Sequence, residues 1–107
     1  EKLRNIWIQK EYLLEFSMFS TLENLIKLAR ERKSVPLDGS YTNKLLADKE
    51  LGKAKVLEEV DELIEAIEKD TNKIHEAADV FYHLLVYLEA NDVKIEEVMR
   101  ELEKRKK

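Results

Sequence analysis

A chain of 107 residues is long enough for one domain and too short for two, so we expect residues 1–107 to form a single domain. The formal net charge is −4 and basic residues are interleaved with acids, which argues against the basic surface of a typical nucleic-acid-binding protein. The chain has no cysteine and no apolar run near the roughly 18 residues that span a bilayer, which excludes thiolate metal sites, argues against membrane spans and indicates a cytoplasmic protein.

The first part of the chain contains one clear helix and the main loop. Residues 1–19 suit either a helix or a short hairpin; we favour a helix, because no other segment has the pattern of a strand, and we treat them as an N-terminal extension of the domain in residues 20–107. The segment from Ser20 to Glu23 has the pattern of a capping box and predicts a helix over residues 20–33. Residues 34–40 hold the one Pro and one of the two Gly, which predicts a loop.

The rest of the chain predicts further helices. A short helix is expected over residues 41–47, followed by a break near Gly52. A long helix over residues 53–69, a tight connection over residues 70–72 and a second long helix to residue 90 come next. Asn91 and Asp92 form a turn before a last helix over residues 95–106. The predicted fold class is therefore all-α, an antiparallel helical bundle.

The helix predicted over residues 53–69 places acids beside its apolar stripe. Positions 56, 57, 60, 63, 64 and 67 hold Val, Leu or Ile and form one face at about 100° per residue. Glu59 and Glu62, three residues apart, lie at the edge of this face with Glu58 beside them, where they can point into a groove between helices. Taken alone, these acids are more simply explained as a solvated face.

The helix predicted up to residue 90 is apolar on nearly every side and should be largely buried, yet Glu76, Asp79 and His83 lie along one of its faces. Burying an unpaired carboxylate costs on the order of several kcal/mol, so these acids need a cation or a proton. With Glu59 and Glu62 they form an oxygen cage suited to Mg²⁺, or alternatively Mn²⁺. A di-iron bundle would need a His three residues after Glu59 and after Glu76, and neither position holds one. His83 alone is more simply explained as a core histidine.

Several segments of the sequence resemble a known family. Glu58-Glu59-x-x-Glu62 followed by Glu76-x-x-Asp79 resembles the metal-binding signature of the all-α MazG-like pyrophosphohydrolase superfamily. The block Glu31-Arg32-Lys33-x-x-Pro36-x-x-Gly39-Ser40-Tyr41-Thr42-x-Lys44-Leu45 is similar to the substrate loop of the phosphoribosyl-ATP pyrophosphatase family within it. Residues 76–86 and 98–102 are similar to the second metal helix and the tail of that family. The resemblance covers residues 22–105.

The resemblance implies a reaction and a set of residues. The reaction is the hydrolysis of phosphoribosyl-ATP to phosphoribosyl-AMP and pyrophosphate, an early step of histidine biosynthesis, by Mg²⁺-assisted attack of water. Glu58 and Glu62 are implied in catalysis, with Glu58 as the candidate base or second-metal ligand, and the cation is expected on Glu59, Glu62, Glu76 and Asp79. Substrate contacts are expected from eight residues: Arg32, Lys33, Ser40, Tyr41, Thr42, Lys44, Lys55 and His83.

Other functions are compatible with the same residues. One is a MazG-like pyrophosphohydrolase that acts on other nucleoside or deoxynucleoside triphosphates, and another is a non-catalytic helical interaction module. The family also implies a homodimer or higher homo-oligomer that completes the bundle, and the apolar surplus of residues 74–90 points the same way. We interpret residues 1–19 as a remnant of a fused upstream domain or as an added dimer contact, and phosphoribosyl-AMP cyclohydrolase is the expected fusion or working partner.

Overall fold

All regular secondary structure in the described part of the chain is α-helical. The computed structural model describes residues 19–106, and the helix predicted within residues 1–19 lies, except for Phe19, outside them. The helices in order are α2 (Ser20–Ser34), α3 (Tyr41–Ala47), α4 (Lys49–Lys69), α5 (Lys73–Ala90) and α6 (Ile95–Arg105). The predicted all-α class is confirmed. Across residues 19–106, each helix is too short or too polar to cross a bilayer.

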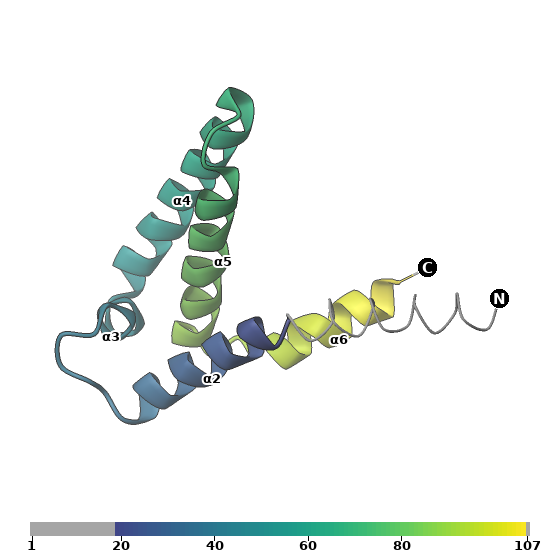
Figure 1. Ribbon diagram of the computed structural model, residues 1–107. Helices are drawn as coiled ribbons and strands as arrows, with labels where there is room; N and C mark the ends of the chain where they lie inside the picture. Colours follow the sequence, from purple (N-terminus) through teal and green to yellow (C-terminus); the bar gives the residue numbers. More distant parts are fainter. Residues whose placement is uncertain (1–18, 107) are drawn as a thin grey trace, which may run out of the picture.

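The centre of the fold is a hairpin of two long helices. Figure 1 shows α4 and α5 side by side and antiparallel, with α2 crossing near the open end of the hairpin and α3 beside the start of α4. The connection over residues 70–72 is as tight as predicted, because Asp70 (φ 56°) and Asn72 (φ 40°) both adopt left-handed backbone conformations. Asp and Asn tolerate this region better than most residues, which explains their place in the turn.

The predicted break near Gly52 is wrong. The chain breaks at Asp48 instead, whose carboxylate accepts a hydrogen bond from the Leu51 N–H at 3.0 Å and caps α4. Gly52 lies buried inside α4, where a Cβ would be 3.1 Å from Cδ1 of Tyr87 on α5. The glycine therefore serves close packing of α4 on α5 and not the end of a helix.

The start of α2 is where it was predicted, but the predicted capping box is wrong. Phe19 occupies the N-cap position with helical dihedral angles (φ −69°, ψ −10°), and its own side chain makes no cap hydrogen bond. The Phe19 carbonyl accepts from the Leu22 N–H at 3.1 Å. Ser20 consequently lies in the first turn of the helix, where its hydroxyl does not act as the cap.

The hairpin is less buried than the sequence predicted. Ile74 is 89% exposed and Phe81 57% exposed, although α5 was expected to be largely buried. The reason is that the core where α5 meets α2, α3 and α4 takes up one side of the helix and is built from few residues: Ala29, Leu45, Ala66, Val86 and Ala90 are each at most 5% exposed. The result is an open arrangement that leaves an apolar side of α4 and α5 uncovered within residues 19–106.

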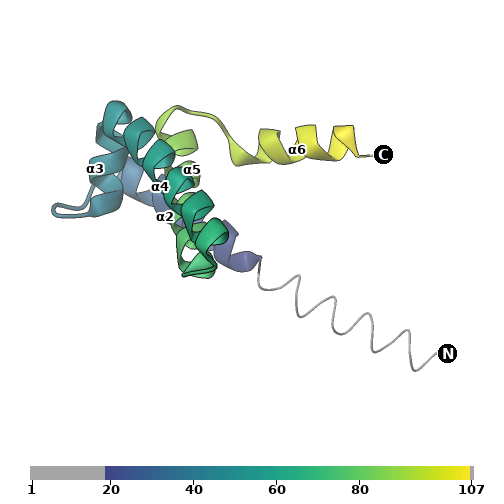
Figure 2. The same cartoon turned by 90° about the horizontal axis from the view of Figure 1, so that it is seen from above.

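The last helix projects from this body. α6 has no buried residue, and the two views agree that it runs away from the α4–α5 hairpin (Figure 2). Arg30 of α2 fixes its first turn, because the guanidinium donates to both carboxylate oxygens of Glu96, at 2.8 and 2.5 Å. This bidentate pair lowers the pKa of the Glu96 carboxyl to about 2.

Candidate functional site

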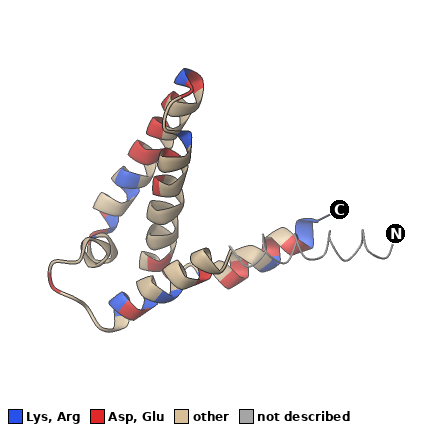
Figure 3. Ribbon diagram, in the orientation of Figure 1, with Lys and Arg blue, Asp and Glu red and all other residues tan. Residues whose placement is uncertain are grey.

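Three carboxylates from α4 and α5 meet in the half of the hairpin nearest the connection. Oxygens of Glu59, Glu62 and Glu76 lie within 4.8 Å of one another. Figure 3 shows acidic segments on both helices in this region. Glu59 is 7% exposed, so the sequence placed it correctly beside the apolar stripe but underestimated its burial. The antiparallel pairing of the helices brings together residues that are 14 or more positions apart in the chain.

Two oxygens of this group are buried without a partner. Among the described residues, Glu59 Oε2 and Glu76 Oε2 have no hydrogen-bond donor. Burial is the main cause that raises the pKa of both carboxyls, and the nearby carboxylate of Glu62 adds to it. Buried carboxylate oxygens are normally paired, so this arrangement indicates a place for a cation.

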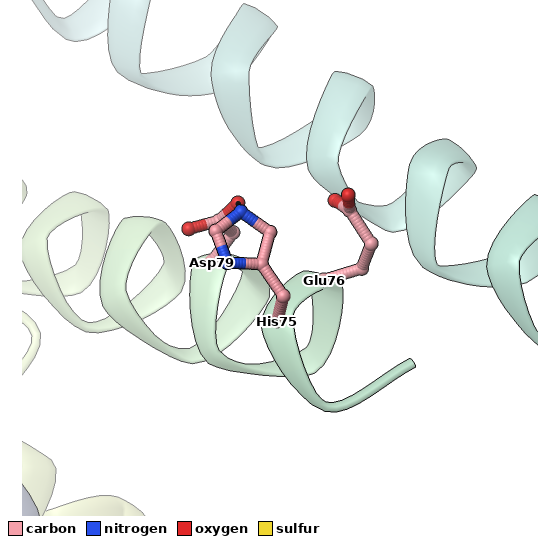
Figure 4. A group of neighbouring side chains, drawn as sticks. All are labelled: His75, Glu76 and Asp79. Atoms are coloured by element: carbon pink, nitrogen blue, oxygen red, sulfur yellow. Dashed lines mark ion pairs between the residues drawn. The ribbon is translucent and has the colours of Figure 1, made fainter. Parts of the chain in front are cut away.

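A second group shares Glu76 with the first. His75, Glu76 and Asp79 each offer a ligand atom within 4.8 Å of the others. Nε2 of His75 lies 3.4 Å from Oδ2 of Asp79, one helical turn further on. Figure 4 shows the imidazole and the Asp79 carboxylate lying together on α5, with the Glu76 carboxylate directed towards α4. The sequence analysis treated Asp79 as a ligand and missed His75, although the i,i+4 spacing from Asp79 was a usable signal.

His83 links the carboxylate helix to α3. Its Nδ1 lies 2.8 Å from the Asp79 carbonyl oxygen, which can only accept, so Nδ1 carries the proton. In the neutral ring Nε2 therefore accepts, and the Tyr41 hydroxyl donates to it at 3.0 Å. Burial raises the pKa of Tyr41, which keeps this hydroxyl protonated. His83 is 7% exposed, as expected for a core histidine with satisfied nitrogens, and it also touches the predicted substrate residue Tyr41.

A second contact between the same helices lies beside the first. The hydroxyls of Thr42 and Tyr82 are 2.6 Å apart, and Thr42 is buried. The rings of Tyr41 and Tyr82 stack at 6.3 Å between centroids, and both rings meet His83 edge-on. These contacts hold the start of α3 against α5, so the loop before α3 has a fixed position relative to the carboxylates.

The loop over residues 35–40 is organised by Asn43, which the sequence analysis did not single out. Its side chain accepts from the Leu37 N–H at 2.9 Å and donates to the Arg32 carbonyl at 2.7 Å. Ser40 caps α3 by accepting from the Asn43 N–H, and Gly39 has φ 80°, a conformation that favours glycine. A hollow in the surface is lined here by Pro36, Leu37, Asp38, Gly39, Ser40, Tyr41, Asn43 and Lys44.

The predicted basic residues are dispersed. Lys44 lines the loop hollow, and Lys55 donates to Glu58 at 2.9 Å, which raises the pKa of the lysine. Glu58 belongs to neither carboxylate group. Lys33 pairs with Asp92 and donates to the Glu89 carbonyl at 2.8 Å. Glu89 is 13 positions beyond Glu76, about 20 Å along α5, so the structure does not bring Lys33 to the carboxylates.

The sequence itself identifies the group of proteins to which this chain is related. Residues 21–106 match the profile of the phosphoribosyl-ATP pyrophosphohydrolase family. The chain belongs to this family. It is 48% identical over 92 residues to the phosphoribosyl-ATP pyrophosphatase of Cereibacter sphaeroides, a match that covers 80% of this chain and 86% of the relative. The same enzyme name applies to a Halobacterium salinarum relative, 39% identical over 95 residues, with 83% of this chain and 100% of the relative covered.

Some relatives of this chain are larger proteins. The histidine biosynthesis bifunctional protein of Pyrococcus furiosus is 40% identical over 97 residues, which are 88% of this chain but 44% of that protein. This chain therefore spans less than half the length of that relative. The family name agrees with the resemblance found in the sequence, and the match over residues 21–106 contains both carboxylate groups and the loop.

Proposed function

We propose that this chain hydrolyses phosphoribosyl-ATP to phosphoribosyl-AMP and pyrophosphate, in the cytoplasm, with Mg²⁺ or alternatively Mn²⁺ held between α4 and α5. Membership of the phosphoribosyl-ATP pyrophosphohydrolase family supports the reaction. One structural observation carries the proposal of a cation: Glu59 Oε2 and Glu76 Oε2 are buried and lack a donor among the described residues, in two side chains that each bring an oxygen within 4.8 Å of Glu62. A divalent cation would satisfy both oxygens and offset the repulsion between the three acids.

The donor set fits a hard cation. Glu59, Glu62 and Glu76 provide oxygens within 4.8 Å of one another, and Asp79 adds a carboxylate on the next turn of α5. When bound, the cation supplies positive charge to phosphate oxygens and acidifies water. Because phosphoryl transfer depends mainly on positioning and charge, a site of this kind can catalyse it without a nucleophilic side chain.

The remaining residues act on the substrate and on the proton. In hydrolysis, the oxygen of water bonds to a phosphorus atom, the bond from phosphorus to the oxygen that bridges the α and β phosphates breaks, and pyrophosphate leaves. We assign to Glu58 the role of the base that accepts the proton of that water; Glu58 is exposed, and its carboxylate lies 2.9 Å from the Lys55 ammonium. We assign contacts with the substrate phosphates to Lys55 and Lys44. The loop hollow beside Lys44 would take part of the substrate, with Ser40, Tyr41 and Thr42 fixed at its edge. Arg32 and His83 complete the proposed substrate contacts, whereas Lys33 is left out of them because it pairs with Asp92 beyond the other end of α5.

The test is pyrophosphate release from phosphoribosyl-ATP, with dATP and dUTP in parallel, with and without Mg²⁺. We expect Mg²⁺-dependent turnover of phosphoribosyl-ATP that falls by a factor of about 10² or more in Glu62→Gln, because one carboxylate of the cation set is lost. Glu65→Gln is the matched control, since Glu65 is exposed on the same helix and pairs with Lys69 instead. Preferred turnover of dATP or dUTP would indicate the broader nucleotide pyrophosphohydrolase, and no turnover would refute an enzyme.

We further propose that the bundle is completed by a second copy of the chain. Exposed apolar residues recur along α4 at helical spacing, Leu57 (61% exposed), Ile64 (49%) and Ile67 (57%), and continue on α5 with Ile74. A stripe of this length is unusual on a monomer surface. Light scattering should show that the wild type is a homodimer or higher homo-oligomer and that Ile64→Glu is a monomer. The control Lys53→Glu, on the same helix, should remain an oligomer. A monomeric wild type would refute the proposed oligomer.

The reaction product defines the expected partner. Phosphoribosyl-AMP is the substrate of phosphoribosyl-AMP cyclohydrolase, so we propose that this enzyme acts next, either fused to this chain or as a separate protein. Relatives named as bifunctional and trifunctional histidine biosynthesis proteins support an arrangement in one polypeptide.

A further inference from the structure

The loop over residues 35–40 keeps its shape with little help from the burial of its own apolar side chains. Val35 is 70% exposed and Leu37 is 53% exposed, so both gain little from apolar packing. The backbone of Leu37 is instead held at both of its polar groups: its N–H donates to Asn43 Oδ1 at 2.9 Å, and its carbonyl accepts from the Ser40 N–H at 3.2 Å. Hydrogen bonds therefore hold this loop, and one of them comes from a side chain outside it.

The amide of Asn43 joins the loop to the end of α2. Its Nδ2 donates to the Arg32 carbonyl at 2.7 Å while its Oδ1 accepts from the Leu37 N–H. A peptide N–H can only donate and a peptide carbonyl can only accept, so the two partners fix the orientation of the amide. Asn43 thereby sets the position of the loop and of the backbone at Arg32 relative to α3, which carries Lys44.

The formation of α3 does not explain this side chain. Ser40 caps the helix by accepting from the backbone N–H of Asn43 at 3.2 Å, a bond that any residue except proline could make. Asn is also a weaker helix former than Ala or Leu. What accounts for Asn43 is the pair of side-chain hydrogen bonds to backbone groups 6 and 11 positions earlier in the chain.

We propose that Asn43 is a positioning residue that holds the loop in its substrate-binding shape before the substrate arrives. The proposal deepens the function proposed above and rests on it, because the hollow beside Lys44 is the proposed substrate site. Tyr41 and Thr42 fix α3 on the carboxylate helix α5, and Asn43 extends that fixed position to the loop and to Arg32. A loop that is ordered in advance loses less entropy on binding, so its order favours substrate affinity more than the turnover of the bound complex.

Steady-state kinetics of Asn43→Ala test this role. The substitution removes both side-chain hydrogen bonds and leaves the cap of α3, which uses the backbone N–H, in place. We expect KM for phosphoribosyl-ATP to rise about fivefold or more while kcat changes by less than about twofold. Asn91→Ala is the matched control and should keep the wild-type KM, because the Asn91 amide also donates to a backbone carbonyl, that of Tyr87 at 2.8 Å, in a bond that does not reach the loop.

Amide hydrogen exchange of the substrate-free protein, followed by NMR, tests the loop without the reaction. The Leu37 N–H should exchange about fivefold faster in Asn43→Ala than in the wild type, because it loses its acceptor. Asn43→Asp should keep the slow exchange of Leu37, since a carboxylate still accepts that bond. It should nevertheless raise KM, since a carboxylate cannot donate to the Arg32 carbonyl. Asn91→Ala should leave the exchange of Leu37 unchanged.

The outcomes separate this proposal from the proposed function. If the wild type is active and Asn43→Ala keeps its KM, or lowers kcat alone, the positioning role is overturned. A Leu37 exchange rate that is the same in Asn43→Ala and the wild type, or an equal rise of KM in Asn91→Ala, overturns it as well. A wild type without turnover of phosphoribosyl-ATP refutes the proposed function itself, and the role of Asn43 for this substrate falls with it.

Discussion

Replacing Glu59 by Gln should stabilise the protein when no divalent cation is present. Oxygens of Glu59 and Glu62 lie within 4.8 Å of each other, and two charges at that distance repel by about 1 kcal/mol in a water-like dielectric and by about 3.5 kcal/mol at an effective dielectric constant of 20. The amide removes this repulsion with almost no change of shape. Because the raised pKa of Glu59 already relieves part of it, we expect a gain of about 1–2 kcal/mol. For a domain of this size, each kcal/mol raises Tm by roughly 4–8 °C.

The same substitution should remove stabilisation by the cation. Wild-type protein at a Mg²⁺ concentration 100 times Kd gains about 2.7 kcal/mol, whereas Glu59→Gln should gain far less because a ligand is missing. The assay is thermal unfolding followed by circular dichroism at 222 nm, in chelator and in Mg²⁺, with Glu65→Gln as the exposed control on α4. If Glu59→Gln lowered Tm in chelator while Mg²⁺ still raised it as in the wild type, the interpretation of Glu59 as a buried cation ligand would be wrong.

Three further predictions concern pH, the loop and the contact between α3 and α5. Burial raises the pKa of Glu59 and Glu76, so the folded metal-free chain binds more protons than the unfolded chain. The contribution of these two groups to the unfolding free energy should be highest below pH 4.5 and should fall as pH rises through their raised pKa values. Denaturation measured across pH 5–8 should show this fall, and the fall should be smaller in Glu59→Gln. Gly39→Ala should destabilise the protein by about 1 kcal/mol, because a backbone φ of 80° is unfavourable for any residue with a Cβ. It should also raise KM more than it lowers kcat. An unchanged KM would count against the loop as a substrate contact. Thr42→Val and Tyr82→Phe should each cost about 1 kcal/mol in urea denaturation, and additive effects in the double variant would contradict a direct 2.6 Å hydrogen bond.

Local sequence patterns predicted most helices and both carboxylate pairs, because these depend on residues a few positions apart. The i,i+3 spacing placed Glu59 with Glu62, and Glu76 with Asp79, on common helix faces. Because a short turn joins the two helices, they pack antiparallel and these two faces lie close together. The same logic failed at Gly52, where a residue 35 positions away, Tyr87, decides the role of the glycine. Helix breakers can be recognised from the sequence, but a close approach of two helices cannot.

The substrate residues were less predictable for the same reason. Asn43 organises the loop through contacts to Leu37 and Arg32, which no periodic pattern reveals. Lys33 is close in sequence to the loop yet pairs with Asp92, just after the end of α5, because the direction of α2 across the hairpin carries it there. The expected burial of α5 also failed, since periodicity reports that a face is apolar and does not report which chain covers it.

The three-residue turn between α4 and α5 means that the carboxylates and the loop come from different segments of the chain, so the two can change independently in evolution. Glu59, Glu62, Glu76 and Asp79 all come from this one hairpin, so closing the short chain segment between them costs little conformational entropy, and the proposed cation ligands are assembled locally. The loop over residues 35–40 comes from a different part of the chain and meets the hairpin through Tyr41 and Thr42. Substitutions that redirect the protein towards another nucleotide can therefore accumulate in the α2–α3 segment while the hairpin, and with it the chemistry, is inherited unchanged.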